Sequence, residues 1–329
     1  MKKNIALVAG GYTGESVVSL NSAAQVEKNL DTAKYNVYKI IIDRENWNYT
    51  SADGKVCAID KNDFSINIDN EKISFDCAFI IIHGSPGEDG KLQGYFDLIG
   101  LPYTSCDATT SALTMNKAYS KALVSHIKGL NTAKSVQLFS RNDYTDQQLK
   151  DLLKLPLFIK PNNGGSSIGM SKVNHWDELS DAITRAFNEG SEVLIEEFIQ
   201  GREFTVGIYK SQGAIKVLPI TEIKTSKEFF DYEAKYTDGV TEEVTPAVLS
   251  EEQTAKVGEI VKKAYQQLNC KGMVRIDFIL ESGNNDFYFI EINTIPGQSA
   301  NSIIPQQVRA AGQSVEEFYG NLIEEALVN

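Results

Sequence analysis

The sequence predicts an α/β fold of two or three domains that begins with a parallel β-sheet. Its 329 residues exceed the roughly 100 to 200 residues of a typical domain. In the first hundred residues, short apolar runs alternate with helical stretches, which is the order that produces βαβ units and a parallel sheet. The first apolar run, residues 5–9, ends in a glycine pair and is too short for a signal segment.

The expected elements follow in order along the chain. In the N-terminal part we expect strands at 5–8, 37–42 and 78–82, helices at 19–30 and 92–99, and an added hairpin around 64–68 within the polar segment 43–76. Next come a helix at 112–127, a strand near Val136, a helix at 146–153 and strands at 157–160 and 168–173. Further on we expect strands at 193–195, 204–209 and 215–220, a helix at 251–268, a strand pair, and helices at 303–311 and 315–327.

Composition narrows the classes of partner. The formal net charge of −12 disfavours nucleic acid and anionic membranes, because both need a basic surface. The longest apolar runs fall well short of the roughly 18 residues of a membrane span. The four cysteines are far apart and form no Cys-x-x-Cys pair. We therefore expect a cytoplasmic protein that binds neither nucleic acid nor membrane.

A glycine-rich segment, KPNNGGSSIG, runs from Lys160 to Gly169. Glycines let a backbone approach a ligand closely, and hydroxyl and amide groups donate hydrogen bonds to phosphate oxygens. Lys160 supplies a local positive charge within an acidic chain. We interpret the segment as a phosphate-binding loop, and a plain glycine-rich hairpin is the alternative.

The same segment also fits the G-x-S-x-G pattern of α/β-hydrolases, with Ser167 as the nucleophile. That pattern needs a helix directly after the serine, whereas residues 168–173 are expected to form a strand. The one histidine after Ser167 is His175, which is too close in sequence for the order of residues in hydrolases. The sequence therefore disfavours a hydrolase.

Four polar residues near the C-terminus are expected to share one face of a hairpin. The turn sequence SGNN at 282–285 should place Asp277 opposite Glu291 and Arg275 opposite Asn293. Alternation along both strands then puts Val274, Ile276, Ile290 and Ile292 on the other face. Two carboxylates and an amide oxygen suit Mg²⁺, and the arginine can neutralise a transferring phosphoryl group. A solvated face of salt bridges is the alternative.

Weaker signals accompany the glycine-rich segment and the C-terminal hairpin. Residues 193–204 run from a strand into a linker, where backbone groups can bind an adenine edge and Glu196 or Glu203 can bind ribose hydroxyls or metal. Glu15 and His83 follow the ends of expected parallel strands, where open α/β sheets bind ligands. Taken alone, each of these features is better explained by a structural role, a domain connector for 193–204 and a satisfied polar side chain for His83.

Taken together, these segments resemble the D-alanine-D-alanine ligase family of the ATP-grasp superfamily. The match runs in order from Gly10 to Ser302. The matching pieces are Gly10-Gly11 with Glu15 and Ser19-Leu20; His83-Gly84 with Gly87-Glu88-Asp89-Gly90; Lys117; Lys160-Pro161 with Gly165-Ser166-Ser167; Glu196; Glu203-Phe204-Thr205-Val206; Asp231-Tyr232-Glu233-Ala234-Lys235-Tyr236; Gly272 with Arg275-Ile276-Asp277; Glu291-Ile292-Asn293-Thr294; and Pro296-Gly297 with Ser302.

The resemblance implies an ATP-grasp architecture of three domains, at 1–105, 106–196 and 197–329. ATP would lie between the central and C-terminal domains and D-alanine at the junction with the N-terminal one. The residues implied to bind ATP are Lys117, Lys160, Ser167, Glu196, Glu197, Glu203 and Lys235. The residues implied to bind two Mg²⁺ or Mn²⁺ ions are Asp277, Glu291 and Asn293.

The resemblance also implies how the amino acids are held. Glu15 would take the ammonium of the first D-alanine, and Ser166 and Tyr236 would complete a hydrogen-bonded chain that closes the loop 229–239 over the site. The oxyanion would be stabilised by Arg275 and the backbone amide of Gly297. The remaining substrate contacts would come from His83 and Ser302, of which Ser302 receives the second carboxylate.

Two alternatives remain open at this point. Related depsipeptide ligases make D-alanyl-D-lactate and often carry phenylalanine where this chain has Tyr236, which favours the dipeptide. An ATP-grasp protein that binds ligands without turnover is disfavoured by the intact Arg275, Asp277, Glu291 and Asn293. The chain departs from the commonest family pattern at Ser16-Val17 and at Glu197, where lysine is frequent. A homodimer is suggested by the resemblance alone.

Overall fold

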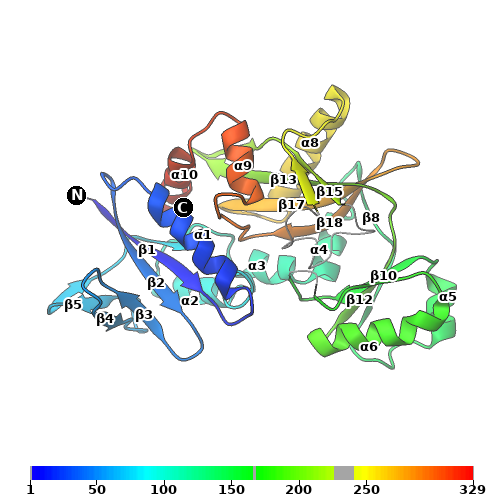
Figure 1. The fold of residues 1–329 in the computed structure, drawn as a ribbon, viewed down its shortest axis with the longest axis horizontal. Coiled ribbons are helices and arrows are strands. Elements are labelled where there is room, and N and C mark those ends of the chain that lie inside the picture. Colours follow the sequence, from blue (N-terminus) through cyan, green and yellow to red (C-terminus); the bar gives the residue numbers. More distant parts are fainter. Residues whose placement is uncertain (1, 166–167, 226–240, 329) are drawn as a thin grey trace.

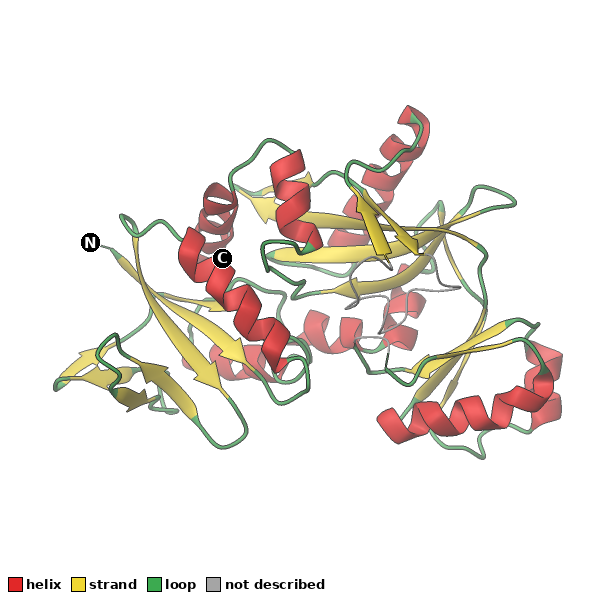
Figure 2. Cartoon of the chain, viewed as in Figure 1, coloured by secondary structure: helices red, strands yellow, loops and turns green. Residues whose placement is uncertain are grey.

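The computed structural model describes residues 2–165, 168–225 and 241–328, which are arranged around separate sheets (Figures 1 and 2). The N-terminal sheet lies at one end of the elongated molecule, and a second sheet lies at the other end. A third, larger sheet lies between them and above them in this view. The α/β class expected from the sequence is confirmed.

The N-terminal sheet has the strand order β4-β3-β2-β1-β7. Its strands are β1 (Lys3–Gly10), β2 (Tyr35–Ile42), β3 (Trp47–Thr50), β4 (Val56–Ala58) and β7 (Cys77–Ile80). β1 is parallel to both β2 and β7, as predicted, and α1 (Ser16–Asn29) provides the crossover from β1 to β2. The sheet as a whole is mixed, since the insertion adds β3 and β4 as antiparallel strands. The expected hairpin is β5 (Ile66–Ile68) with β6 (Glu71–Ile73).

The helical segment after this sheet differs from the expectation. A single helix at 112–127 is wrong, because the chain forms α3 (Ala108–Met115) and α4 (Lys117–Val124). Asn116 interrupts the helix with extended backbone angles, and its side chain accepts a hydrogen bond of 3.0 Å from the Tyr119 backbone. This capping interaction stabilises a new helix start directly before Lys117.

The second sheet has the order β11-β10-β12-β9 and is antiparallel throughout. Its strands are β9 (Ser135–Leu138), β10 (Leu157–Pro161), β11 (Ser171–Val173) and β12 (Val193–Glu197). The helices α5 (Asp146–Leu152) and α6 (Leu179–Glu189) pack with it around a separate apolar core. The strand expected at 168–173 is shorter, beginning at Ser171, and no helix directly follows the glycine-rich segment, which agrees with the rejection of a hydrolase.

The third sheet has the order β16-β15-β13-β17-β18-β8, and β14 pairs with β13. Its strands are β8 (Leu130–Thr132), β13 (Gly201–Ser211), β14 (Ala214–Val217), β15 (Thr221–Thr225), β16 (Thr241–Val244), β17 (Met273–Glu281) and β18 (Phe287–Asn293). One face packs on α8 (Glu251–Gln267) through residues such as Val206 and Val257. One face of the third sheet is therefore covered by α8. A cavity that could hold a ligand lies between its other face and the second sheet.

The last two helices return to the N-terminal end of the molecule. α9 (Ile303–Ala310) and α10 (Val315–Val328) share one apolar core with β1, β7 and α2 (Lys91–Ile99). The rings of Phe79 on β7 and Tyr319 on α10 meet edge to face, 5.7 Å apart. The sequence separation of these contacts exceeds 200 residues, so only the folded chain reveals them.

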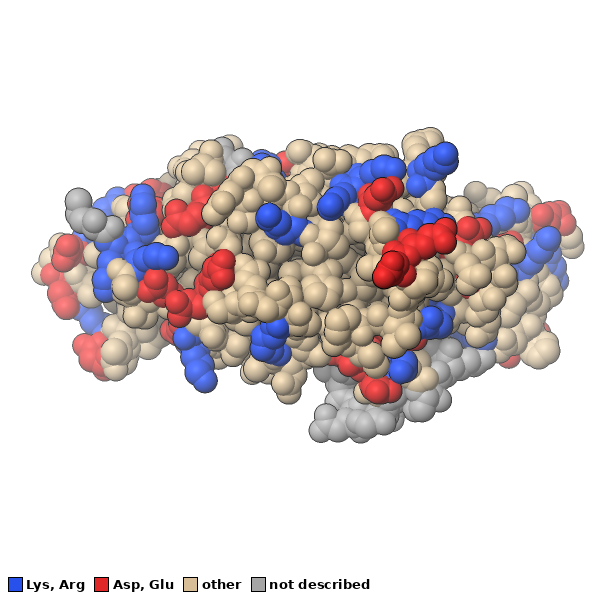
Figure 3. Space-filling model, turned by 90° about the horizontal axis from the view of Figure 1, so that it is seen from above, with Lys and Arg blue, Asp and Glu red and all other residues tan. Residues whose placement is uncertain are grey.

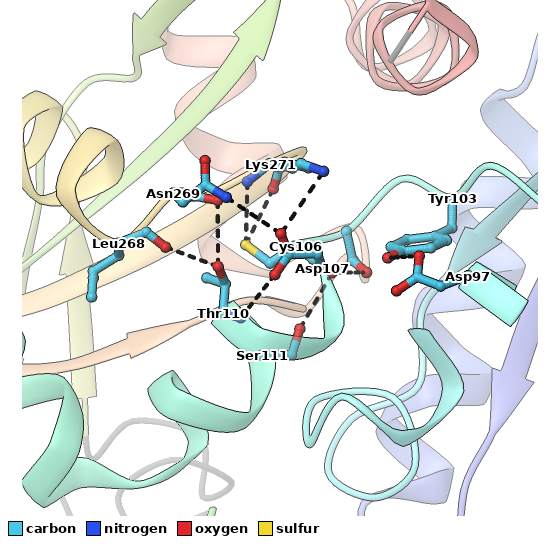
Figure 4. A network of polar contacts seen from close by, with 10 residues as sticks. Asp97, Tyr103, Cys106, Asp107, Thr110, Ser111, Leu268, Asn269 and Lys271 are labelled. Atoms are coloured by element: carbon cyan, nitrogen blue, oxygen red, sulfur yellow. Dashed lines mark hydrogen bonds and ion pairs between the residues drawn. The ribbon is translucent and has the colours of Figure 1, made fainter. Parts of the chain in front are cut away.

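A polar network ties α3 to the segment between α8 and β17 (Figure 4). Asp107 caps α3 by accepting a hydrogen bond of 2.9 Å from Thr110, whose hydroxyl donates to the Leu268 carbonyl at 2.9 Å. The buried thiol of Cys106 donates to the Lys271 carbonyl at 3.3 Å. These contacts fix the position of α3, and thereby of α4, against the third sheet.

Charged residues of both signs lie on the surface. On the face seen in Figure 3, lysine and arginine lie interspersed with aspartate and glutamate. Within the described part of the chain, no helix is long and apolar enough to cross a membrane.

Candidate active site

Two cavities, each of about 470 Å³, are both lined by residues of the β17–β18 hairpin. The first lies between the second and third sheets, and the second lies between the third sheet and the loops after β1 and β7. Both are lined by Lys117, Arg275 and Glu291, and by the backbone at Gly164 and Gly165. Two ligands held in the two cavities would therefore meet at these residues.

Every described residue that was predicted to bind a ligand or to take part in catalysis lines one or both cavities. The first cavity is lined by Lys117, Lys160, Glu196, Glu197, Glu203, Arg275, Asp277 and Glu291. The second is lined by Glu15, His83, Lys117, Arg275, Glu291, Asn293, Gly297 and Ser302. Four predicted residues, Ser166, Ser167, Lys235 and Tyr236, lie outside the described residues.

In the first cavity, one face of the second sheet carries the charged groups. Phe158 of β10 lies opposite Glu196 of β12, and Lys160 is two residues along, so all three share a face. The carboxylate of Glu196 contacts the ammonium groups of both Lys160 and Lys121. Burial alone would raise the pKa of Glu196, but these two cations outweigh it and hold the pKa at about 2.

Lys121 was missed in the sequence, although a signal was present. It follows Lys117 by one helical turn on α4, so both side chains point toward the same side of that helix. Both lysines are buried, with 4% of Lys121 and 8% of Lys117 exposed. A pair of buried lysines at this spacing in an acidic protein indicates an anionic environment or an anionic ligand.

Lys117 is placed by the start of α4 and reaches the junction of the cavities. Its ammonium lies 3.3 Å from Glu291 and also contacts the Gly164 carbonyl. The helix start is anchored by Asn162, which directly follows β10. The Asn162 side chain accepts a hydrogen bond of 2.9 Å from Ala118, and its carbonyl accepts one of 3.2 Å from the Lys117 backbone. The glycine-rich segment and α4 are thus held together.

The C-terminal hairpin has the register predicted from the sequence. Asp277 of β17 lies opposite Glu291 of β18, and Arg275 lies opposite Asn293. One expectation is wrong, because Ile290 is half-buried and lines the first cavity and does not belong to the apolar core. A β-bulge causes this, since Phe278 pairs with Phe289 and Ile290 is the extra residue.

Asp277 accepts hydrogen bonds from three different side chains. Arg275 donates to both of its oxygens, at 2.9 and 2.7 Å. The Asn293 amide donates to it at 3.1 Å, and the Thr205 hydroxyl also donates. This arrangement holds the guanidinium of Arg275 at the junction of the two cavities with a fixed orientation.

The hairpin residues fit a hard divalent cation only with further ligands. Asp277, Glu291 and Asn293 offer oxygen donors from adjacent strands, the type that Mg²⁺ prefers. Among the described residues, no group of three or more histidine, cysteine, aspartate or glutamate side chains is arranged to hold a metal. Such an ion would need oxygens from phosphate or water, which is usual for Mg²⁺ in phosphoryl-transfer sites.

In the second cavity, Glu15 approaches the glycine-rich segment. Glu15 directly precedes α1, at the end of the loop that follows β1. A Cβ atom added at Gly165 would lie 2.9 Å from a carboxylate oxygen of Glu15, so a larger residue at 165 would displace that carboxylate. Gly165 therefore permits the approach of the two segments across the cavity.

The buried His83 lies at the deep end of the second cavity, and the half-buried Glu88 also lines this cavity. Burial lowers the pKa of His83 to about 4, so the imidazole is neutral at neutral pH. Burial raises the pKa of Glu88 to about 8; Glu15 acts in the same direction, whereas backbone hydrogen bonds from Gly84 and Ile295 and the charge of Arg275 oppose it. Glu88 was not selected from the sequence, although it lies in the matched Gly87-Glu88-Asp89-Gly90 motif.

The raised pKa of Glu88 predicts a pH-dependent stability. Between pH 6.5 and 8 the native state keeps a proton on Glu88 that the unfolded state has lost, so stability falls as pH rises. His83 contributes little above pH 6.5, because it is neutral in the native state and mostly neutral when unfolded. We expect the melting temperature of the wild type to fall between pH 6.5 and 8.5 relative to that of Glu88→Gln. Parallel curves of melting temperature against pH would refute the protonated state.

Ser302 also lines the second cavity and directly precedes α9. Its hydroxyl lies 2.8 Å from that of Ser299, and a Cβ added at Gly297 would lie 3.0 Å from it. Backbone N–H groups at a helix start favour anions, so this corner suits a carboxylate. Glu243 of β16 also lines the cavity, and its side chain accepts a hydrogen bond of 2.5 Å from Gln306 of α9.

The rim of the first cavity holds Glu197, one of the residues that depart from the commonest family pattern. The Glu197 side chain accepts a hydrogen bond of 3.0 Å from the Lys154 backbone. Nearby, Arg202 forms two hydrogen bonds of 2.8 Å with Glu222, a pair that was not predicted. Glu203 lines the same rim.

Most of the chain matches two models of one protein family. Residues 4–106 match the model described as D-ala D-ala ligase N-terminus, and residues 124–324 match the model described as D-ala D-ala ligase C-terminus. The chain belongs to the D-alanine-D-alanine ligase family. The D-alanine--D-alanine ligase of Flavobacterium johnsoniae is 48% identical over 99% of both chains, and that of Parabacteroides distasonis is 45% identical over 100% of this chain and 99% of the other.

Solved structures of ligases have the same fold. The D-Ala:D-Ser ligase VanG from Enterococcus faecalis superposes with a TM-score of 0.88 at 32% identity, over 99% of this chain and 100% of the other. The D-alanine--D-Alanine ligase from Bacillus anthracis complexed with ATP superposes with a TM-score of 0.79 at 30% identity, over 100% and 98%. The ATP-grasp ligase fold expected from the motifs is confirmed, and the roles of individual residues stay predictions.

Proposed function

We propose that this chain joins two D-alanine molecules into D-alanyl-D-alanine at the expense of ATP, as a step in peptidoglycan precursor synthesis. The observation that carries the proposal is the pair of cavities that meet at Lys117, Arg275 and Glu291. Such a junction suits the transfer of a phosphoryl group from a nucleotide in one cavity to a carboxylate in the other. The full-length identity to D-alanine--D-alanine ligases supports the choice of substrate.

ATP is assigned to the first cavity. Its adenine and ribose would bind near Glu196, Glu197 and Glu203, where β12 runs into the linker to β13. Its phosphates would lie along Lys160 and Lys117 toward the hairpin, because these ammonium groups line the cavity within an acidic protein. Ser167 and Lys235 are proposed as further phosphate ligands on the strength of the sequence motif.

Two Mg²⁺ or Mn²⁺ ions are proposed at Asp277, Glu291 and Asn293. Bound together with the phosphates, the ions would neutralise the charge that develops during phosphoryl transfer. The oxygen-only donor set of the hairpin supports this choice. Arg275, which is fixed by Asp277, would stabilise the same transferring group and the later oxyanion, together with the backbone amide of Gly297.

The amino acids are assigned to the second cavity. Glu15 would pair with the ammonium of the first D-alanine, His83 would contact it from the deep end, and Ser302 at the start of α9 would receive the carboxylate of the second. Ser166 and Tyr236 would complete the hydrogen-bonded chain that the sequence motif implies. Enclosure of this kind protects a reactive intermediate from water.

The reaction follows from the carboxylate being a poor electrophile. The terminal phosphoryl group of ATP is transferred to the first D-alanine carboxylate, which gives an acylphosphate and ADP. The amine of the second D-alanine, after losing a proton from its ammonium form, attacks the acyl carbon. The tetrahedral intermediate collapses to the dipeptide and releases inorganic phosphate. Positioning and preorganised charge supply most of the catalysis.

Several broader expectations accompany this proposal. We propose domains at 1–105, 106–196 and 197–329, a cytoplasmic location and a homodimeric assembly, of which the last rests on resemblance alone. A reaction that consumes ATP and builds a cell-wall precursor supports the cytoplasmic location.

The test is phosphate release with ATP, Mg²⁺ and D-alanine, with the product identified by mass spectrometry. L-alanine alone serves as a control, and mixtures of D-alanine with D-lactate or with D-serine test the second substrate. We expect phosphate and dipeptide from D-alanine alone. Faster formation of a mixed product than of the dipeptide would contradict the assigned substrate, and no phosphate release with any amino acid would contradict the ligase activity.

A further inference from the structure

Lys121 is a buried charge for which the proposed reaction has no assigned role. Only 4% of the residue is exposed, and its ammonium contacts one carboxylate oxygen of Glu196 and donates to the Ala133 carbonyl at 2.9 Å. The other oxygen of Glu196 contacts the ammonium of Lys160. One carboxylate therefore joins two lysines that come from different elements, α4 and β10.

The group carries a net charge of +1 in a site with little access to water. The side chains of Lys121, Lys160 and Glu196 are 4%, 6% and 10% exposed. A buried charge that loses its partner is strongly unfavourable, because neither water nor protein compensates it. Any ligand that draws one lysine away must therefore leave Glu196 with another cation.

The two lysines differ in whether they can reach a ligand in the first cavity. Lys160 lines the first cavity, whereas Lys121 lies behind Glu196 and does not line it. An anionic phosphate bound in the cavity would attract Lys160 away from Glu196. If Glu196 then had no partner, its charge would be unpaired and would also repel the phosphate.

We infer that Lys121 is a positioning residue for nucleotide binding, which compensates Glu196 and so allows Lys160 to pair with phosphate. This inference rests on the proposed ATP site. It assigns no contact between Lys121 and the nucleotide, and it predicts that the benefit of Lys121 depends on the negative charge of Glu196. The relevant quantity is the ratio of the dissociation constant for adenosine to that for a non-hydrolysable ATP analogue with Mg²⁺.

The experiment measures both dissociation constants by calorimetry for the wild type and for Lys121→Met, Glu196→Gln and the double variant. Adenosine lacks phosphates and does not require Lys160 to move, so its affinity reports on the shape of the pocket. In Lys121→Met we expect the ratio to fall by about tenfold or more, which corresponds to the loss of one favourable charge interaction. Lys128→Met, at an exposed lysine that follows α4, serves as the matched control.

The double variant decides between the possible roles. With Glu196 neutral, Lys121 is no longer needed as a counter-charge, so Glu196→Gln and Lys121→Met/Glu196→Gln should have ratios within about threefold of each other. If Lys121 instead attracted phosphate directly, its replacement would lower the ratio equally in both backgrounds. The ratio of the double variant would then lie below that of Glu196→Gln by as much as the ratio of Lys121→Met lies below that of the wild type. This comparison also holds if Lys121→Met alone does not fold, because the double variant leaves no unpaired carboxylate.

Each outcome supports or overturns the inference. The inference is supported if the ratio is lowered in Lys121→Met but the double variant has the same ratio as Glu196→Gln. Equal weakening of adenosine and nucleotide in Lys121→Met, or a lowered ratio that persists in the double variant, overturns it while the ATP site stands. A wild type that binds no nucleotide overturns the ATP site and the inference together.

Discussion

Replacing Glu291 by alanine is expected to leave the fold intact and to remove nearly all Mg²⁺-dependent turnover. Glu291 lines both cavities, lies opposite Asp277 and is 3.3 Å from the ammonium of Lys117. Its loss would remove one of two carboxylates available to the ions at the transferring phosphoryl group. We expect kcat to fall by about 100-fold or more, because the charge neutralised there is worth several kcal/mol.

The measurement is the rate of phosphate release as a function of Mg²⁺ concentration, with circular dichroism and thermal unfolding as tests of folding. Glu281→Ala is a suitable control, since Glu281 ends the same strand β17 and does not line either cavity. Full activity of Glu291→Ala at low Mg²⁺ would show that the metal assignment is wrong.

Replacing Arg275 by lysine is expected to have a comparable effect on kcat, although the positive charge is kept. The guanidinium donates to both oxygens of Asp277 and, in this orientation, lies where the two cavities meet. An ammonium group cannot form the same planar pair of hydrogen bonds. We expect kcat to fall by about 100-fold or more through lost stabilisation of the developing charge. The free energy of unfolding should fall by about 1 to 2 kcal/mol, because Asp277 loses a charge-assisted hydrogen bond.

The same substitution at Arg202 provides the comparison. Arg202 forms an equivalent pair of hydrogen bonds with Glu222, at the rim of the first cavity and away from the junction. Arg202→Lys should change the KM for ATP more than kcat, whereas Arg275→Lys should change kcat more than the KM. Steady-state kinetics in both substrates test this difference, and a kcat of Arg275→Lys within threefold of the wild type would refute the assigned role.

Much of the local geometry follows from short-range rules. The turn at 282–285 and the alternation of polar and apolar residues were sufficient to predict that Asp277 faces Glu291 and that Arg275 faces Asn293. The exception, Ile290, depends on a bulge, which changes the side of the strand on which a residue lies and leaves no clear signal in the sequence. The break at Asn116 was predictable from its capping side chain but was missed because the apolar pattern continues across it.

The α/β class, the order of the strands along the chain and the motifs that predict a nucleotide and a metal site all follow from the sequence alone. These depend on periodicity, turn residues and glycine, which act over a few residues. Other features depend on the folded chain: Lys121 and Lys160 share Glu196, Glu88 and Arg275 line the same cavity, and α9 and α10 join the N-terminal core. These features arise from burial and from charges brought together across long separations, because the free energy of a buried charge depends on neighbours that no local pattern specifies.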